Sequence, residues 1–403
     1  MRVRIERPRG TRDFLPDEME RRKAIENVMR RVAESFGYRE VATPTFEHLE
    51  LFTLKSGEGI VEEIYAFKDK SGRDLALRPE LTAPVMRMFV NECSVMPRPL
   101  RFYYFSNCFR YERPQKGRYR EFWQFGVELI GSDRPESDAE VIYLAYRILR
   151  ELGVEFTLHV GHVGLLREVL KDVGEKDRAM RLIDKKDWDG LKSLLKSENR
   201  GDLYKTVVQL SSAADFESAK EVFPDFDYSH LERVAEILES LDVEFELDFG
   251  IARGLDYYTG VVFEMYAEGL GAQRQVCGGG SYRLAKLFGG DDVPSTGFAI
   301  GFDRVAEVCR VEAVKGRTAV VIGFGDHVRA LRVADVLRRA GVRAIVDVMG
   351  RNVRKQLSFA DSINADYAVF AGEEVERGFI TVKDLKSGEQ VEVKLEDVRS
   401  FFG

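Results

Sequence analysis

The sequence predicts an α+β protein in which helices flank an antiparallel sheet, with a helical insertion and a C-terminal α/β domain. Its first half runs helix, strand, hairpin, helix, hairpin, helix, and so lacks the repeated βαβ units of a parallel sheet. Residues 165–242 are rich in Leu, Lys, Asp and Glu at helical spacing, and beyond Lys315 strands and helices alternate. We therefore predict a core formed by 1–164 and 243–314, the insertion at 165–242, and the α/β domain at 315–403.

The first half begins with a helix after Pro16 and continues to a hairpin around Lys70–Gly72. Apolar residues recur at helical spacing from Ile25 to Phe36, and Gly37 ends the helix. Alternating residues on both sides of the glycine turn predict two paired strands. The same reasoning predicts a strand at 38–42, a helix at 81–92, strands at 100–111 and 120–131, and a helix at 137–152.

Strand signals return after the insertion. Three consecutive glycines, Gly278–Gly280, predict a tight turn. The predicted strands lie at 245–249, 258–266, 273–277, 296–301, 318–322, 343–347 and 367–371, and the predicted helices at 302–311, 327–340 and 353–363.

The composition is that of an ordinary globular protein. Hydrophobic residues make up 44% and charged residues 32% of the 403 positions, which excludes bulk disorder. The net charge of −7 excludes a purely electrostatic DNA binder but not a local basic face. Residues 315–356 have ten Lys/Arg against three Asp/Glu, whereas 357–403 have five against ten, so the basic face is expected in the first of these stretches.

Cysteine usage and hydropathy indicate a cytoplasmic protein. The four cysteines form no C-x-x-C pair and are too few for a disulfide framework, which fits a reducing compartment. The N-terminus has no apolar signal region, and no apolar run approaches the ~18 residues of a membrane span. His159 and His162 form H-x-x-H without a neighbouring cysteine or carboxylate in the sequence, so we expect no metal site.

The candidate chemistry centres on arginines rather than on a glycine-rich phosphate loop, since the Gly323-Phe324-Gly325 segment lacks the third glycine of a dinucleotide fingerprint. Arg110 ends a strand before a basic loop at 112–119, where its guanidinium could bind a phosphate. A solvated hairpin tip explains these residues equally well. Gln124 and Glu128 share strand parity with each other. A sheet face with Arg110, Gln124 and Glu128 is unfavourable as hydrophobic core, because buried polar groups without partners cost free energy. Such a face suits the binding of a charged small molecule.

Two later segments also allow two interpretations. Arg253-Gly-Leu-Asp-Tyr-Tyr258 is either part of a site or a hydrophobic hairpin with aromatic cross-strand pairs. Gly301-Phe-Asp-Arg304 places an arginine in the first turn of a helix, or is plain glycine packing between strand and helix.

Together these segments resemble a known family. Phe109–Glu112 with Phe122 resembles motif 2 of class II aminoacyl-tRNA synthetases, and Gly301–Arg304 resembles motif 3. The helix into Gly37 with the strand ending at Pro44 resembles motif 1. Two further segments are similar to the histidyl-tRNA synthetase family: Arg253–Tyr258 to its histidine-specific motif, and Arg113–Arg120 to its motif 2 loop. The similarity extends over nearly the whole chain and is weakest across 165–242.

The resemblance implies activation of histidine with ATP, followed by transfer to histidine tRNA. It implies an ATP site formed by Arg110, Glu112, Arg118, Phe122 and Arg304. It implies a histidine site formed by Glu80, Leu81, Thr82, Arg110, Gln124, Glu128, Arg253, Tyr257 and Tyr258. The implied catalytic residues are Arg110, Arg253 and Arg304, and the implied contacts to the tRNA acceptor end are Arg113, Gln115 and Lys116. The resemblance further implies Mg²⁺ bridging the phosphates, an anticodon-binding C-terminal domain and a homodimer.

Two other functions remain alternatives. Synthetase-like paralogues serve as regulatory subunits of ATP phosphoribosyltransferase, but they generally lack the C-terminal domain and have a degraded histidine-specific motif. A class II synthetase for threonine, proline or glycine is disfavoured by the Arg253–Tyr258 segment. The sequence also departs from the family, which usually has Gly-Gly-Arg-Tyr-Asp where this chain has Gly279-Gly280-Ser281-Tyr282-Arg283. This departure leaves the orientation of Tyr282 open.

Overall fold

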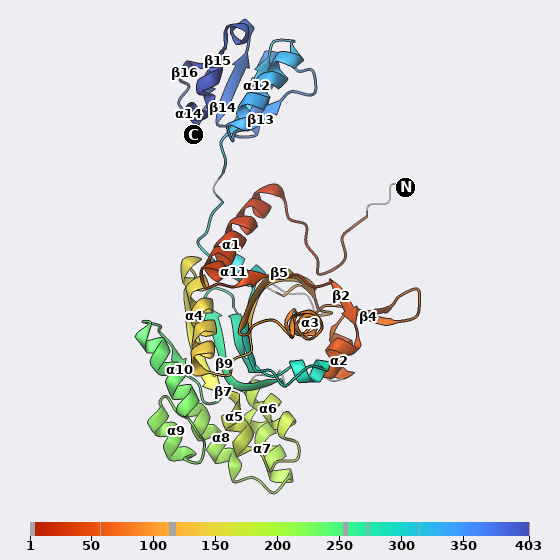
Figure 1. Ribbon diagram of the computed structural model, residues 1–403, viewed down its shortest axis with the longest axis vertical. Helices are drawn as coiled ribbons and strands as arrows, with labels where there is room; N and C mark the ends of the chain where they lie inside the picture. Colours follow the sequence, from red (N-terminus) through yellow and green to blue (C-terminus); the bar gives the residue numbers. More distant parts are fainter. Residues whose placement is uncertain are drawn as a thin grey trace. The chain divides into compact units, whose positions relative to one another are not determined.

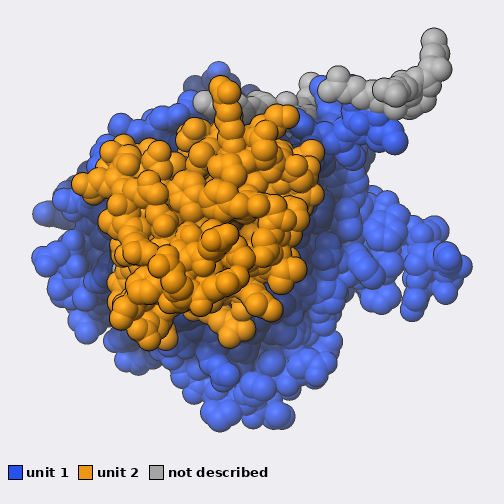
Figure 2. Space-filling model, turned by 90° about the horizontal axis from the view of Figure 1, so that it is seen from above, with its two compact units in different colours: residues 1–313 blue, residues 314–403 orange. Residues whose placement is uncertain are grey.

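The computed structural model describes residues 5–56, 58–112, 118–252, 257–271, 274–313 and 315–402, with the side chains of residues 58 and 59 excepted. It divides the chain into two compact units, Met1–Ala313 and Val314–Gly403 (Figure 2). Each unit has a sheet and a hydrophobic core of its own, so each is described separately.

An eight-stranded sheet forms the centre of the first unit (Figure 1). In spatial order its strands are β1 (Arg39–Glu40), β5 (Leu100–Phe109), β6 (Glu121–Ile130), β11 (Ser295–Gly301), β10 (Gln275–Tyr282), β9 (Tyr258–Ala267), β7 (Phe156–His162) and β8 (Glu246–Leu247). The two outermost pairs are parallel and the five inner pairs are antiparallel. The predicted antiparallel sheet with flanking helices is therefore confirmed.

Helices cover this sheet with apolar faces at helical spacing. The helix α1 (Pro16–Ser35) begins at a proline and buries Ile25, Met29 and Val32. Gly37 follows it at φ +81°, a conformation that favours glycine. The helix α4 (Pro135–Glu151) packs in the same core, and α11 (Phe302–Val308) follows directly from β11.

A second, three-stranded sheet lies in the same unit, in the order β2 (Phe46–His48), β4 (Asp74–Leu77), β3 (Ala66–Lys68). The helices around it are α2 (Glu50–Ser56), a 3-10 helix η1 (Glu58–Glu63), and α3 (Thr82–Met88). The helix predicted at 81–92 is α3 followed by a short π-helix, η2 (Phe89–Cys93). A further 3-10 helix is η3 (Ala285–Phe288).

Six helices follow one another in the chain segment that connects β7 to β8 (Figure 1). They are α5 (Val163–Val169), α6 (Lys176–Asp184), α7 (Trp188–Ser197), α8 (Leu203–Ser212), α9 (Phe216–Val222) and α10 (Ser229–Ser240). Their buried leucines and valines join the core of the sheet, so this helical segment is part of the first unit.

The tight turn predicted at Gly278–Gly280 is wrong, because these glycines lie within β10 at the centre of the sheet. Gly279 pairs with Phe298 on one side and Phe263 on the other. A Cβ atom on Gly279 would lie 2.3 Å from the carbonyl oxygen of Gly297. The glycine is thus needed for close strand approach rather than for a change of direction.

The second unit has a five-stranded sheet in the order β13 (Arg343–Val346), β12 (Thr318–Gly323), β14 (Tyr367–Ala371), β15 (Phe379–Asp384), β16 (Gln390–Lys394). The first three strands are parallel, as the alternating pattern predicts, with α12 (His327–Arg339) and α13 (Val353–Ser362) as the connections. The antiparallel pair β15–β16 was not predicted. The unit also contains the 3-10 helices η4 (Glu373–Arg377) and η5 (Leu395–Asp397), and it ends with α14 (Val398–Phe402).

Candidate active site

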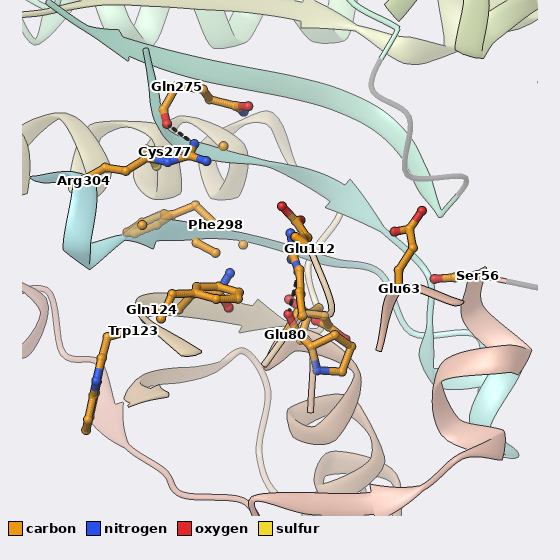
Figure 3. Close-up of a pocket in the computed structure, with 18 of the residues that line it drawn as sticks. Ser56, Glu63, Glu80, Glu112, Trp123, Gln124, Gln275, Cys277, Phe298 and Arg304 are labelled. Atoms are coloured by element: carbon orange, nitrogen blue, oxygen red, sulfur yellow. Dashed lines mark hydrogen bonds between the residues drawn. The ribbon is translucent and has the colours of Figure 1, made fainter. Parts of the chain in front are cut away.

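A cavity of about 620 Å³ lies in the first unit, against β6, β10 and β11 (Figure 3). The helix α2, the start of α3 and the start of α11 complete its walls. Figure 3 shows Arg304, Gln275 and Cys277 on one side of the cavity and Glu63 and Ser56 on the other. The cavity therefore brings together segments from four distant parts of the sequence.

Glu128 forms the most buried polar part of this wall. Glu128 lies on β6 and is 1% exposed. One carboxylate oxygen accepts a hydrogen bond from the Tyr104 hydroxyl at 3.0 Å, and the other accepts one from the Tyr282 hydroxyl. Burial raises the pKa of Glu128 to about 7, although hydrogen bonds from Tyr282, Thr82 and Tyr104 act in the opposite direction. The carboxyl group can thus exist in either protonation state near neutral pH.

Tyr282 points to Glu128 although its neighbours Ser281 and Arg283 depart from the family pattern. Its ring is buried and its hydroxyl donates to Glu128, inside the cavity wall. The preceding Ser281 donates to Asp138 at 2.8 Å, and Arg283 forms exposed ion pairs with Asp133 and Asp292. The altered neighbours therefore point away from the Glu128 carboxyl group.

Glu80 lies where α3 begins and has a partner that sequence reasoning missed. Lys55 Nζ is 3.0 Å from a Glu80 carboxylate oxygen, and the lysine side chain is only 3% exposed. The same ammonium group lies 4.3 Å from the centre of the Tyr257 ring. Glu80 also accepts from the backbone N–H of Ala83 at 3.2 Å. No sequence signal pairs Lys55 with Glu80, because they lie 25 positions apart with the strands β3 and β4 between them in the sequence.

The other residues of the implied histidine site divide between wall and core. Gln124, Thr82, Tyr257 and Tyr258 line the cavity. The Gln124 side-chain oxygen accepts from Cys108 Sγ at 3.4 Å, and the Tyr257 hydroxyl donates to that of Tyr258 at 3.3 Å. Leu81 instead packs in the hydrophobic core, 2% exposed, and does not line the cavity.

Arginines line the cavity around Phe122. Arg110 donates to the carbonyl oxygen of Pro79 at 3.0 Å, and its guanidinium carbon lies 5.2 Å from the centre of the Phe122 ring. Arg304 donates to the carbonyl oxygen of Gln275 at 2.7 Å. Arg118 forms an ion pair with Glu112. Phe122 thus offers an aromatic face beside cationic groups.

Three positive charges lie close together at this end of the cavity. Burial lowers the pKa of Arg304, and the nearby positive charges of Arg118 and Arg110 lower it further. A partly buried arginine with two further cations beside it suits an anion with several charges.

Four residues implied at the site lie outside the described residues: Arg253, Arg113, Gln115 and Lys116. Within the described ranges, no group of three or more His, Cys, Asp or Glu residues is placed to hold a metal ion. His159, of the H-x-x-H pair, lies 3.7 Å from Glu246. In the same described part of the chain, no helix is long and apolar enough to cross a membrane.

Comparison with known proteins decides the family. The family model for histidyl-tRNA synthetase matches residues 10–305, and the model for the anticodon-binding domain matches residues 318–403. The chain belongs to the histidyl-tRNA synthetase family. It is 63% identical to the histidine–tRNA ligase of Archaeoglobus fulgidus over 408 aligned positions, which cover 99% of both chains.

Solved structures agree with this histidyl-tRNA synthetase assignment. The apo histidyl-tRNA synthetase of S. aureus has 27% identity and a TM-score of 0.74, covering 99% of this chain and 100% of that one. A protein from Bacillus halodurans described as an ATP phosphoribosyltransferase regulatory subunit/histidyl-tRNA synthetase has 28% identity and a TM-score of 0.78, covering 92% and 99%. The predicted family and fold class are confirmed.

The function of this histidyl-tRNA synthetase follows from the family and from full-length identity. The chain is a histidine–tRNA ligase, a class II aminoacyl-tRNA synthetase with ATP as a substrate. The reaction first forms histidyl-adenylate and pyrophosphate, and then transfers histidine to tRNA.

Proposed function

We propose that both reactants of the first step bind in the cavity of the first unit, with histidine at the Glu128 end and ATP at the arginine end. The observation that carries this proposal is the contrast within one cavity between a buried carboxyl group that accepts from two tyrosine hydroxyls and a cluster of three arginines. An imidazole needs one hydrogen-bond partner for each ring nitrogen, and a triphosphate needs cations.

At the histidine end, Glu128 and Tyr258 bind the imidazole, while Glu80, Thr82 and Gln124 bind the ammonium group. Lys55 is a positioning residue here, because its ion pair fixes one Glu80 oxygen. Tyr257 packs over the Lys55 ammonium group and completes the wall. A dry pocket of such polar partners rejects amino acids that lack the imidazole by large factors, since its own groups would be left unpaired.

At the ATP end, Phe122 and Arg304 enclose the adenine and Glu112 accepts from its amino group. Arg110 binds the α-phosphate, and Arg118 binds the outer phosphates. Arg253 stabilises the charge on the α-phosphate as the histidine carboxylate attacks. A histidine carboxylate oxygen then attacks the α-phosphorus, a new P–O bond forms, and the bond to the β-phosphate oxygen breaks to release pyrophosphate. Arginines fixed in place before the reaction stabilise the charge that spreads over the phosphate oxygens.

Mg²⁺ fits this site as an ion held mainly by the substrate. The described residues provide no group of three carboxylates or histidines for it, and Mg²⁺ usually binds through phosphate oxygens and water with one or two carboxylates. When bound, the ion neutralises part of the charge on the phosphates.

The second step needs tRNA at two places. Arg113, Gln115 and Lys116 contact the acceptor end, whose terminal hydroxyl attacks the histidyl carbonyl carbon and releases AMP. The anticodon binds the second unit, on the basic stretch 315–356 that begins the predicted domain 315–403. The core is then 1–164 with 243–314, and 165–242 is its insertion. We also propose that the protein is cytoplasmic and forms a homodimer with motif 1 at the interface. Sedimentation would detect the dimer.

ATP–pyrophosphate exchange without tRNA, run with each standard amino acid in turn, tests this function. Exchange with histidine alone is the expected result. Exchange with a different amino acid would contradict the assignment of Glu128 and Tyr258 to the imidazole. Histidine binding without exchange would favour the regulatory role named for the Bacillus halodurans protein.

A further inference from the structure

The N-terminal segment before α1 contacts both ATP-binding segments. The carbonyl oxygen of Gly10 accepts a hydrogen bond from the backbone N–H of Arg120 at 2.9 Å, where the motif 2 hairpin re-enters β6. Gly10 has φ +88°, and a Cβ atom there would lie 2.7 Å from Arg120 Cγ. The segment therefore follows the base of the hairpin at a distance that only glycine allows.

Two residues later, Arg12 joins two residues that line the cavity. Its Nη2 atom lies 2.5 Å from an Asp303 carboxylate oxygen, and its guanidinium carbon lies 3.5 Å from the centre of the Tyr119 ring. Tyr119 follows the motif 2 loop, and Asp303 immediately precedes Arg304 in the first turn of α11. One planar guanidinium group thus stacks on one ATP-binding segment while it pairs with the other.

Asp303 does not depend on Arg12 alone. The same oxygen accepts from Arg22 at 2.8 Å, and the other oxygen accepts from the backbone N–H of Trp123 at 2.7 Å. The Asp303 side chain is 4% exposed. Without Arg12 the buried carboxylate would keep one arginine and one backbone donor. Replacing Arg12 should therefore alter the position of Tyr119 and of the first turn of α11 more than it alters the fold.

The arginines of the cavity need such support. Arg118 and Arg110 repel Arg304, so its position before ATP arrives must be imposed by neighbouring groups. We propose that Arg12 is a positioning residue for ATP, acting through Asp303 on Arg304 and through Tyr119 on the adjacent Arg118. This inference rests on the proposed function, because it assumes that ATP occupies the arginine end of the cavity.

The test compares Arg12→Gln and Arg12→Lys with Arg21→Gln in histidine-dependent ATP–pyrophosphate exchange. Arg21 is a matched control because it too joins the N-terminal part of the chain to the region of α11, by donating to the carbonyl oxygens of Ala306, Cys309 and Val311. It contacts neither Asp303 nor Tyr119. We expect Arg12→Gln to lower kcat/KM for ATP by about 10- to 100-fold, since a misplacement of ~1 Å has effects of this size. The KM for histidine should change less than about twofold.

Arg12→Lys keeps the charge near Asp303 but loses the planar stack on Tyr119. It should remain as stable as the wild type and still lose several-fold in kcat/KM for ATP, so a failure of Arg12→Gln to fold would leave the proposal testable. Three results would each overturn the proposal. They are wild-type ATP kinetics in Arg12→Lys, equal losses for ATP and histidine in Arg12→Gln, and the same ATP defect in Arg21→Gln. If the wild type itself shows no histidine-dependent exchange, the proposed function fails instead.

Discussion

The two ends of the cavity bind charge in opposite ways. At the Glu128 end, one buried carboxyl group is surrounded by neutral hydroxyl donors, and burial keeps its pKa near 7. At the other end, Arg110, Arg118 and Arg304 line the cavity together, and the charges of Arg110 and Arg118 lower the pKa of Arg304. One end is a buried set of hydrogen-bond partners, whereas the other is a partly exposed cluster of arginines.

This difference matches what each end has to distinguish. Selection among amino acids needs hydrogen bonds with fixed geometry, because a missing partner leaves a buried group unpaired. Binding of a triphosphate needs charge, which tolerates some solvent and acts over a longer distance. Substitutions at the first end should therefore change selectivity, and substitutions at the second should change ATP affinity and its salt dependence.

The largest expected effect comes from Glu128→Gln. An amide offers one acceptor oxygen where the carboxylate offers two, and its NH₂ group would face a tyrosine hydroxyl that now donates to Glu128. We expect kcat/KM for histidine to fall by about 10⁴-fold in the exchange assay. ATP binding measured without histidine serves as the control and should change by less than about threefold. A comparable loss of ATP binding would contradict the separation of the two ends.

The sequence predicted the fold better than it predicted the cavity wall. Helices such as α1 follow from local spacing and end signals, and the structure has them within a residue or two of the predicted bounds. The glycines of β10 were misread because a glycine run has the same local signal in a turn and at the crowded centre of a sheet. Only the pairing with β9 and β11, more than ten residues away on either side, distinguishes the two.

Contacts between distant segments likewise could not be predicted from the sequence. Lys55 has no local feature that marks it as a buried partner of Glu80, and Tyr104 reads as one aromatic residue among several on β5. Gln124 and Glu128 were found because strand parity is a local property. Their partners come from other elements, so they needed the assembled structure.

Tyr282→Phe should have an intermediate effect and a defined pH dependence. The Tyr282 hydrogen bond lowers the Glu128 pKa more than those from Thr82 and Tyr104 do. Its loss should raise that pKa above about 7, so the acidic limb of the pH profile of kcat/KM for histidine should move to higher pH. We expect about a tenfold loss at pH 7, the size of a hydrogen bond to a charged group. Tyr104→Phe, which removes the weaker contribution, should move the limb less.

Thermal unfolding provides an independent check of the same pKa. The Glu128 pKa is raised on folding from an ordinary value of 4.5 to about 7, so its neutral form is favoured in the folded chain. Its contribution to stability is present below about pH 4.5 and is lost as the pH rises through about 7. The melting temperature of the wild type should therefore fall relative to that of Glu128→Gln between pH 5 and pH 8. A constant difference would contradict the raised pKa.

Arg118→Gln should have the smallest effect and should tell whether charge alone acts at the arginine end. Its side chain is 44% exposed and pairs with Glu112, so water and salt screen its charge. We expect the KM for ATP to rise by about two- to fivefold at low ionic strength and to approach the wild-type value in about 0.5 M salt, where the Debye length is a few ångströms. Arg39→Gln, an exposed substitution on β1 outside the cavity, is the control for general salt effects. A defect that persists at high salt would mean that Arg118 binds through directed hydrogen bonds, and the arginine end would then resemble the histidine end more closely than we propose.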